Sequence, residues 1–261
     1  MTHDAKSLTQ QQFGAHAAGY VASPTHRAGY SLDRLIEWIA PQPGQRVLDL
    51  ATGGGHTALA LARAGARTVA GDLTAPMLRA ARAYISAEMG DSGSVTFVRL
   101  DAEQLPFPGA AFDAVTCRIA PHHFPDVAQF VRECARAVRP GGVVGVVDQL
   151  APPDPQTARY VNAFERLRDP SHVWAYNRAE WHGFFTAAGL EVAHYEEFDK
   201  EQTLVAWAEL MGCDTPTIAR LRALLIQAPE PAAAWLRPQS PASPDARFSI
   251  RQFLLVGRRT H

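Results

Sequence analysis

Short apolar runs alternate with segments of helical periodicity between residues 45 and 150. An apolar run of about four to eight residues indicates a buried strand, and apolar positions about three to four residues apart indicate an amphipathic helix. The runs that we interpret as strands cover residues 46–50, 67–73, 95–101, 112–119 and 143–148. Helical periodicity fills the intervals 56–66, 75–89 and 127–138. This alternation predicts a parallel sheet with helices on its faces.

The segments on either side of this region predict mainly helices, which would form caps on the sheet. Breaks at proline and glycine mark where these helices end. In chain order we predict helices at 13–21, 32–39, 158–168, 178–188, 203–211 and 217–226, strands at 190–198 and 248–256, and a proline-rich loop at 229–244.

Composition and charge narrow the class of protein. The chain has 261 residues, 47% hydrophobic and 20% charged, which is globular composition with room for one large domain. A formal net charge of −1 gives no electrostatic footprint for nucleic acid. No stretch approaches the roughly 18 apolar residues of a membrane span, no apolar run suggests a secretion signal, and the three cysteines form no disulfide pattern. We expect a cytoplasmic protein that is a monomer or a homodimer.

The first predicted strand leads into a glycine-rich turn and then a helix. Its sequence is Asp49-Leu-Ala51-Thr-Gly53-Gly-Gly55. Glycines let the backbone approach a ligand closely, and the N-terminus of the following helix presents free N–H groups. No lysine follows Gly55, which excludes a mononucleotide phosphate loop. The order also differs from the dinucleotide pattern Gly-x-Gly-x-x-Gly, and the acid Asp49 suits a ligand with an ammonium or sulfonium group better than a pyrophosphate.

The pattern Asp49-x-Ala51-x-Gly53-x-Gly55 resembles motif I of the class I S-adenosylmethionine (SAM)-dependent methyltransferases, with Ala51 where the first glycine often stands. Within that class it is similar to the type 11 and ubiquinone/menaquinone C-methyltransferase-like small-molecule enzymes. The further segments that resemble the family are 101–107, 112–115 and 139–142, so the likeness extends over about residues 45–150. It implies SAM as the cofactor and S-adenosylhomocysteine as its product.

This resemblance also implies the architecture. We expect an α/β fold, a three-layer sandwich with a seven-stranded, mostly parallel Rossmann-like sheet whose last strand is antiparallel. The expected divisions are an N-terminal helical cap over residues 1–44, a SAM-binding core over 45–150, and a C-terminal part over 151–261. The last of these would complete the sheet and carry a helical cap on the acceptor side at about 200–245.

Three acids stand at or near the ends of the first three predicted strands. Asp72 lies about 20 residues past the glycine turn, where a carboxylate accepts hydrogen bonds from the ribose hydroxyls of an adenosine, although it could also cap the next helix. By the resemblance, Asp101 accepts from the adenine amino group and the N–H of Ala102 donates to a ring nitrogen. Because the carboxyl ends of parallel strands share one edge, we predict that Asp49, Asp72 and Asp101 converge there.

The N-terminal pattern from Phe13 to Gly29 resembles the cap that closes over the cofactor in small-molecule methyltransferases. This likeness favours Tyr20 as a cofactor or substrate contact and His26 as a substrate contact, whereas the alternatives are a half-buried packing residue and a surface histidine. The predicted cofactor site comprises Asp49, Ala51, Gly53, Gly55, Asp72, Leu73, Asp101, Ala102, Arg118, Ile119 and Tyr20.

The methyl acceptor would lie where the fourth strand ends, next to His122 and His123. Histidine exchanges a proton near neutral pH, so either residue is a candidate general base, and adjacent histidines normally point in different directions. The alternative is that they cap or pack beneath the following helix. No carboxylate or cysteine stands at ligand spacing nearby, so we predict no metal site. Trp174 and Tyr176 could wall the acceptor pocket or could simply pack under their loop.

We therefore predict an enzyme that transfers a methyl group from SAM to a small molecule. The alternative is that the enzyme methylates a carbon atom of a quinone. However, the quinone enzymes that the core resembles tend to carry an Arg-Asn pair at positions 122 and 123, and they lack a cap like residues 200–245. A SAM-binding module without catalysis and a nicotinamide dehydrogenase are the alternatives from other classes. The glycine order and Asp49 count against the dehydrogenase.

Overall fold

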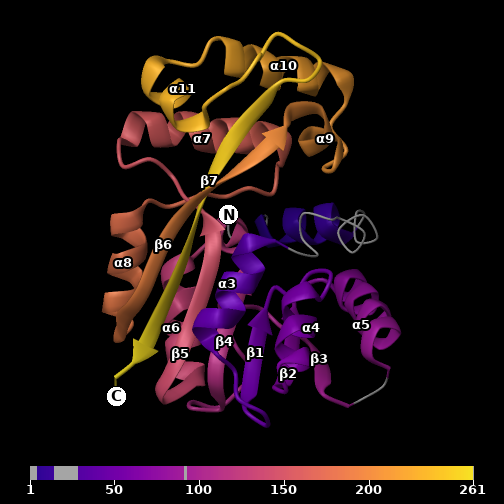
Figure 1. Cartoon of the computed structure of the whole chain (residues 1–261), viewed down its shortest axis with the longest axis vertical. Helices are drawn as coiled ribbons and strands as arrows, with labels where there is room; N and C mark the ends of the chain where they lie inside the picture. The colour runs from indigo at the N-terminus through magenta and orange to yellow at the C-terminus, as the bar shows by residue number, and fades with distance from the viewer. Residues whose placement is uncertain (1–4, 15–28, 91–92, 261) are drawn as a thin grey trace.

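The computed structural model describes residues 5–14, 29–90 and 93–260 (Figure 1). Its strands are β1 (Arg46–Leu50), β2 (Arg67–Asp72), β3 (Val95–Arg99), β4 (Phe112–Arg118), β5 (Val138–Gln149), β6 (Leu190–Thr203) and β7 (Arg247–Arg259). Within the described ranges they form one seven-stranded sheet in the order β3-β2-β1-β4-β5-β7-β6. The pairs from β3 through β5 are parallel, and β7 is antiparallel to both β5 and β6. The predicted sheet is therefore confirmed.

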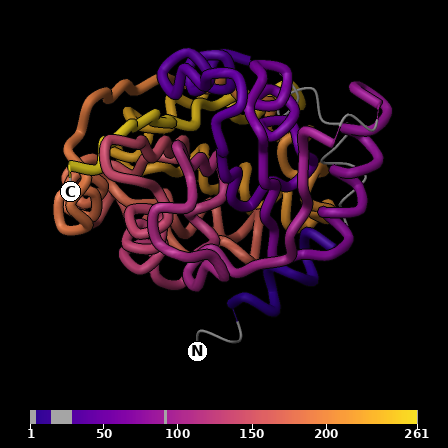
Figure 2. The backbone as a smooth tube through the Cα atoms, turned by 90° about the horizontal axis from the view of Figure 1, so that it is seen from below, coloured from indigo at the N-terminus to yellow at the C-terminus, as the bar shows by residue number. Residues whose placement is uncertain are grey.

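Helices cover both faces of the sheet. They are α3 (Tyr30–Ile39), α4 (His56–Arg63), α5 (Ala75–Met89), α6 (Val127–Ala137), α7 (Pro155–Arg168), α8 (Arg178–Ala187), α9 (Leu204–Glu209), α10 (Thr215–Ile226) and α11 (Glu230–Leu236), with a short 3-10 helix η1 (Pro121–His123). Apolar side chains of α3, α4 and α5 pack on one face, and those of α6 and α8 pack on the other. Seen from below, α5 and α8 lie at opposite edges of the molecule (Figure 2). The predicted three layers are present.

β6 and β7 extend beyond the rest of the sheet. β5 pairs with β7 only from Gln252 to Arg258, whereas β6 stays paired with β7 as far as Thr203 and Arg247. The projecting end of this ribbon lies among α7, α9, α10 and α11 (Figure 1). These helices share a second apolar core with the ribbon, formed by residues such as Phe164, Trp207, Leu221, Leu236 and Phe248. The helices predicted between the last two strands thus lie on this extension.

Two local predictions are wrong. The Arg139–Gly142 segment, which falls between the helix predicted at 127–138 and the strand predicted at 143–148, lies inside β5. Val138 already pairs with Phe112, and a register shift between Phe112 and Ala114 absorbs the extra residues. The predicted loop at 229–244 contains the helix α11. Its prolines stand before and in the first turn, where a missing N–H is tolerated, and Ala232 and Leu236 become buried.

None of the helices in residues 5–14, 29–90 and 93–260 is long and apolar enough to cross a membrane.

Candidate active site

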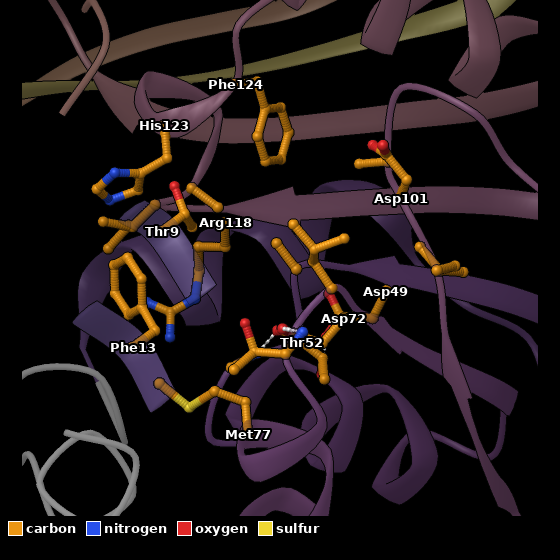
Figure 3. Close-up of a pocket in the computed structure, with 18 of the residues that line it drawn as sticks. Thr9, Phe13, Asp49, Thr52, Asp72, Met77, Asp101, Arg118, His123 and Phe124 are labelled. Carbon is orange, nitrogen blue, oxygen red and sulfur yellow. Dashed lines mark hydrogen bonds between the residues drawn. The ribbon is translucent and has the colours of Figure 1, made fainter. Parts of the chain in front are cut away.

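A pocket opens beyond the carboxyl ends of β1, β2, β3 and β4. Its volume is about 1060 Å³ when the solvent at its entrance is included. This is the edge at which parallel α/β sheets bind ligands. Asp49, Asp72 and Asp101 all line it (Figure 3). The helical segment of residues 5–14, referred to below as the roof helix, adds Lys6, Thr9 and Phe13. One pocket therefore combines the strand ends with a segment from the start of the chain.

The carboxylate of Asp49 is buried at the end of β1. One oxygen accepts from the Thr52 hydroxyl at 2.6 Å, and the other accepts from the Thr116 hydroxyl at 2.9 Å. Burial raises the pKa of Asp49 to about 6, although the two hydroxyls and the nearby Arg118 oppose the shift. The group is therefore ionised at neutral pH, and its negative charge has little contact with solvent.

The glycine turn has a backbone that favours glycine. Ala51, Gly53 and Gly55 have φ values of 51°, 52° and 85°. A Cβ on Gly53 would have only the Ala51 carbonyl oxygen within 4 Å, at 3.9 Å, so this backbone borders open space. A Cβ on Gly55 would instead lie 3.0 Å from both Ala81 Cβ and Ile85 Cδ1. Gly53 thus lines the pocket, whereas Gly55 allows α4 to pack close to α5.

Asp72 fixes the turn from β2. Its Oδ2 accepts from the N–H of Gly53 at 2.9 Å, and its Oδ1 accepts from the N–H of Thr74 at 2.8 Å. Burial raises the pKa of this carboxyl, and the two backbone donors oppose that shift. Each oxygen has capacity for another donor, so holding the turn and binding a ligand are compatible. The following residue, Leu73, also lines the pocket.

Asp101 contacts the roof helix. Its Oδ1 accepts from the N–H of Glu103 at 2.9 Å, and its Oδ2 lies 2.6 Å from Lys6 Nζ. Lys6 Nζ also forms an ion pair with Glu103 at 2.5 Å. Ala102 lies between the two acids in the chain and lines the pocket as well. Ion pairs from Lys6 therefore attach the roof helix to the part of the pocket wall that follows β3.

Arg118 places a buried cation at the end of β4. Its Nε donates to the Thr57 hydroxyl at 3.1 Å, and one terminal nitrogen lies 3.5 Å from the Ser31 hydroxyl. Burial lowers the pKa of Arg118 to about 10, so the guanidinium keeps its charge at neutral pH. Ile119, with a φ of 56°, follows it in the pocket wall.

The structure gives the two predicted histidines different surroundings, although their ring centroids are only 4.1 Å apart. His123 lines the pocket, and its ring lies edge-on to Phe13 with centroids 4.9 Å apart (Figure 3). His122 is not among the lining residues, because Asp148 holds it beneath them: one carboxylate oxygen is 2.6 Å from His122 Nδ1 and the other accepts from its N–H at 2.8 Å. Burial opposes the effect of Asp148, but the carboxylate still raises the pKa of His122. Burial and the neighbouring His122 lower the pKa of His123.

The remaining predicted substrate contacts lie apart from this pocket or outside the described residues. Trp174 packs against Ala151, Ala158 and Ala175, and Tyr176 packs edge-on against Phe184. Neither is among the residues that line the pocket. Tyr20 and His26 fall outside the described ranges. Over those ranges, no group of three or more histidine, cysteine, aspartate or glutamate side chains could hold a metal ion.

Comparison with known proteins decides the family. Residues 48–146 match the model of the Methyltransferase domain family. An uncharacterized methyltransferase of Bacillus subtilis (strain 168), YcgJ, is 35% identical over 200 residues, which are 77% of this chain and 78% of that protein. The chain belongs to the class I SAM-dependent methyltransferases. A crystal structure of a candidate methyltransferase from Bacillus halodurans C-125 is similar along 89% of this chain and 100% of its own, with 33% identity and a TM-score of 0.83.

A methyltransferase with a named acceptor is similar over less of the chain. The demethylmenaquinone methyltransferase of Clavibacter sepedonicus is 36% identical over 135 residues, which are 52% of this chain and 54% of that protein. A match of that extent supports the family without fixing the acceptor of this methyltransferase.

The pocket fits the cofactor that this family uses. The bare backbone at Gly53 leaves room for a close approach, and Asp72 offers acceptor capacity beside it. Opposite charges on Asp49 and Arg118 match a zwitterionic amino-acid group, since each side chain lines the same cavity. The residues that provide this fit, Asp49, Gly53, Asp72 and Arg118, all lie at or just beyond the ends of strands.

Asp49→Asn is expected to stabilise the ligand-free methyltransferase at pH 7 by about 1–3 kcal/mol, because it removes a buried charge. A carboxyl whose pKa is raised in the folded protein binds its proton more tightly there than in the unfolded chain. Wild-type stability therefore falls as pH rises from about 4 to about 6, and the advantage of the variant grows over that window. Urea unfolding at several pH values measures this difference.

Asp113→Asn is the matched control for that experiment. Burial acts to raise the pKa of Asp113, but Arg139 and the N–H of Arg46 together lower it, so this replacement should lower stability at neutral pH. An Asp49→Asn advantage that does not depend on pH would contradict the electrostatic explanation.

Sequence reasoning missed several residues of the site. Lys6 and Thr9 were not singled out, and Phe13 was noted as part of the cap-like N-terminal pattern but not as a site residue, yet all three line the pocket. The available signal was their spacing, since positions 6, 9 and 13 lie on one face of a helix. Thr116, which donates to Asp49, gave no signal because it stands inside a buried strand.

Proposed function

We propose that this methyltransferase transfers a methyl group from SAM to a small-molecule acceptor and releases S-adenosylhomocysteine. The observation that carries the proposal is the convergence of Asp49, Asp72 and Asp101 on one pocket. Such a set of acids matches the cationic and hydrogen-donating groups of SAM better than the phosphates of a dinucleotide.

Each part of the cofactor has a matching set of residues in this proposal. The carboxylate of Asp72 accepts from the two ribose hydroxyls. Asp101 and the N–H of Ala102 bind the edge of the adenine ring. Asp49 and Arg118 supply opposite charges for the ammonium and carboxylate of the amino-acid end. These assignments support a single orientation for the cofactor, with its reactive end toward β4 and η1.

When bound, SAM supplies an electrophilic methyl group attached to a sulfonium. The contribution of the chain is to bind both partners in line and to exclude water, because proximity and orientation provide most of the acceleration in such a displacement. The roof helix supports this role through Thr9 and Phe13, which line the pocket beside Arg118 and His123 (Figure 3). Lys6 joins the roof helix to Asp101 and Glu103.

His123 is the residue of the histidine pair that we assign as the proton acceptor. It lines the pocket, whereas His122 is occupied by Asp148. An O–H or N–H acceptor needs to lose its proton as it is methylated, and a neutral imidazole at the pocket wall can receive it. The lowered pKa keeps His123 neutral at physiological pH.

Replacing His123 by glutamine is expected to lower turnover by roughly a hundredfold to ten-thousandfold, because glutamine can hold a hydrogen bond but cannot take up the proton. Affinity for S-adenosylhomocysteine should change little. Steady-state kinetics and calorimetric titration measure the two quantities. Undiminished turnover on the true acceptor would contradict the assignment. The comparison variant, His122→Gln, should mainly lower the unfolding temperature, since it removes a partner of the buried Asp148.

The function as a whole is tested by calorimetric titration of the wild-type protein with S-adenosylhomocysteine and, separately, with NADH. Binding of the first with a Kd in the micromolar range, and none of the second, is the expected result. A screen of small-molecule acceptors with methyl-labelled SAM then identifies the substrate. Binding of NADH alone would favour the dinucleotide alternative, and binding without any labelled product would favour a non-catalytic module.

A quinone acceptor is the second candidate. The demethylmenaquinone methyltransferase match supports it, but that similarity extends over about half of this chain. The histidine pair at positions 122 and 123 and the cap at 200–245 depart from the quinone enzymes that the core resembles. We therefore infer a different small acceptor, and including demethylmenaquinone in the screen tests the choice.

A further inference from the structure

The loop after α7 holds the Nδ1 edge of His123. His123 Nδ1 lies 3.1 Å from the backbone oxygen of Ser171 and 3.2 Å from Ser171 Oγ. The Ser171 hydroxyl donates to Asp169 Oδ1 at 2.6 Å, and the Ser171 N–H donates to the same oxygen at 2.9 Å. All three residues are buried, so protein groups rather than bulk water determine where the protons lie.

These contacts leave one position for the proton of the neutral imidazole. A carbonyl oxygen can only accept a hydrogen bond, and Ser171 Oγ has already donated its hydrogen to Asp169. Both oxygens must therefore accept from an N–H on His123 Nδ1. Because a neutral imidazole carries one proton, Nε2 keeps its lone pair. The ring itself lies on the pocket wall, edge-on to Phe13 of the roof helix (Figure 3).

Asp169 also provides a charge for the protonated ring. Its Oδ2 lies 3.9 Å from His123 Nε2, so a proton gained at Nε2 would face a carboxylate. A positive charge on His122, whose ring centroid is 4.1 Å away, would oppose protonation of His123. The carboxylate of Asp148 compensates the charge of His122. Arg168 at the end of α7 and His172 in the next loop also act on this cluster, each disfavouring an added positive charge.

We propose that Asp169 and Ser171 are positioning residues that hold His123 as the Nδ1–H tautomer and leave Nε2 as the proton acceptor of the methyl-transfer reaction. This inference rests on the proposed function. As the lone pair of the acceptor atom forms a bond to the methyl carbon, the electrons of the carbon–sulfur bond remain on sulfur and the acceptor's proton moves to Nε2. Asp169 acts on this step through Ser171 and through its charge, without touching the substrate.

The tautomer can be measured on the protein alone. Long-range ¹H–¹⁵N correlation spectra of the ¹⁵N-labelled chain distinguish a protonated from an unprotonated ring nitrogen, and His123→Gln identifies the signals of His123. The expected result is a protonated Nδ1 and an unprotonated Nε2 at neutral pH. A His123 with its proton on Nε2 would overturn the inference.

Two variants and a control test the role of the loop. Asp169→Asn keeps an acceptor for Ser171 but removes the charge, so protonation of His123 should need a pH lower by about one unit or more. Ser171→Ala removes one of the two acceptors on Nδ1 and should populate the Nε2–H form. Asp154→Asn is the matched control, because Asp154 begins α7 and accepts from the N–H and hydroxyl of Thr157 in the same way. It should leave His123 unchanged.

An Asp169→Asn titration of His123 that matches the Asp154→Asn titration would overturn the inference as well. Once an acceptor is known, Asp169→Asn should lower kcat at least tenfold with an unchanged KM for SAM. The spectra require neither cofactor nor acceptor. Failure to bind S-adenosylhomocysteine would therefore defeat the proposed function alone, whereas the wrong tautomer in a protein that binds it would defeat only the positioning role.

Discussion

Replacing Asp72 by alanine is expected to weaken S-adenosylhomocysteine binding by about 100- to 10,000-fold. A hydrogen bond to a charged acceptor contributes about 1.5–3 kcal/mol, and two ribose hydroxyls would lose such a partner. The change also frees the N–H groups of Gly53 and Thr74, which loosens the turn that shapes the pocket. Calorimetric titration of wild type and variant measures the difference.

Asp113→Ala is the control for this experiment. Asp113 likewise accepts from a backbone N–H, that of Arg46 at 2.8 Å, and from Arg139 Nε at 2.7 Å. It stands near the start of β4, at the opposite end of the sheet from the pocket. Its removal should leave cofactor affinity unchanged. Equal affinity of the Asp72 variant and wild type would mean that the ribose assignment is wrong.

Gly55→Ala is expected to lower the free energy of unfolding by about 2–5 kcal/mol. The left-handed backbone at φ 85° costs a residue with a Cβ about 1–2 kcal/mol. The added methyl would also lie 3.0 Å from Ala81 Cβ and Ile85 Cδ1, and overpacking of a buried site costs about 1–3 kcal/mol. Urea unfolding in the absence of ligand measures the sum.

Gly44→Ala separates the two causes. Gly44 has nearly the same backbone, with φ 83°, but a Cβ there would meet nothing within 4 Å. This variant should therefore lose only the backbone contribution, about 1–2 kcal/mol. Equal losses in the two variants would show that the packing of α4 against α5 at Gly55 tolerates a methyl group.

The sheet and the acid-lined edge could be predicted because their signals are local. The strand of residues 46–50 and the glycine turn after it can be recognised from their residue types alone. The helix α5 begins and ends at the predicted residues, 75 and 89. Parallel topology then places Asp49, Asp72 and Asp101 together without any knowledge of side-chain packing.

The parts that could not be predicted depend on contacts between distant residues. Lys6 reaches Asp101 across 95 positions, and no local pattern records that pairing. Which histidine lines the pocket is decided by Asp148 and Ser171, which hold His122 and His123 from β5 and from the loop after α7. Their adjacent positions in the sequence predicted that the two side chains would point in different directions, but not which one would face the cavity.

The ribbon formed by β6 and β7 has a consequence for how the molecule melts. The same two strands that complete the sheet continue without interruption into the core shared by α7, α9, α10 and α11. A hinge between cap and core would have to break the hydrogen bonds of this ribbon, so the two parts gain or lose order together. Differential scanning calorimetry should accordingly record one cooperative transition, with equal calorimetric and van't Hoff enthalpies. Two resolved transitions would mean that the ribbon does not couple the cap to the sheet.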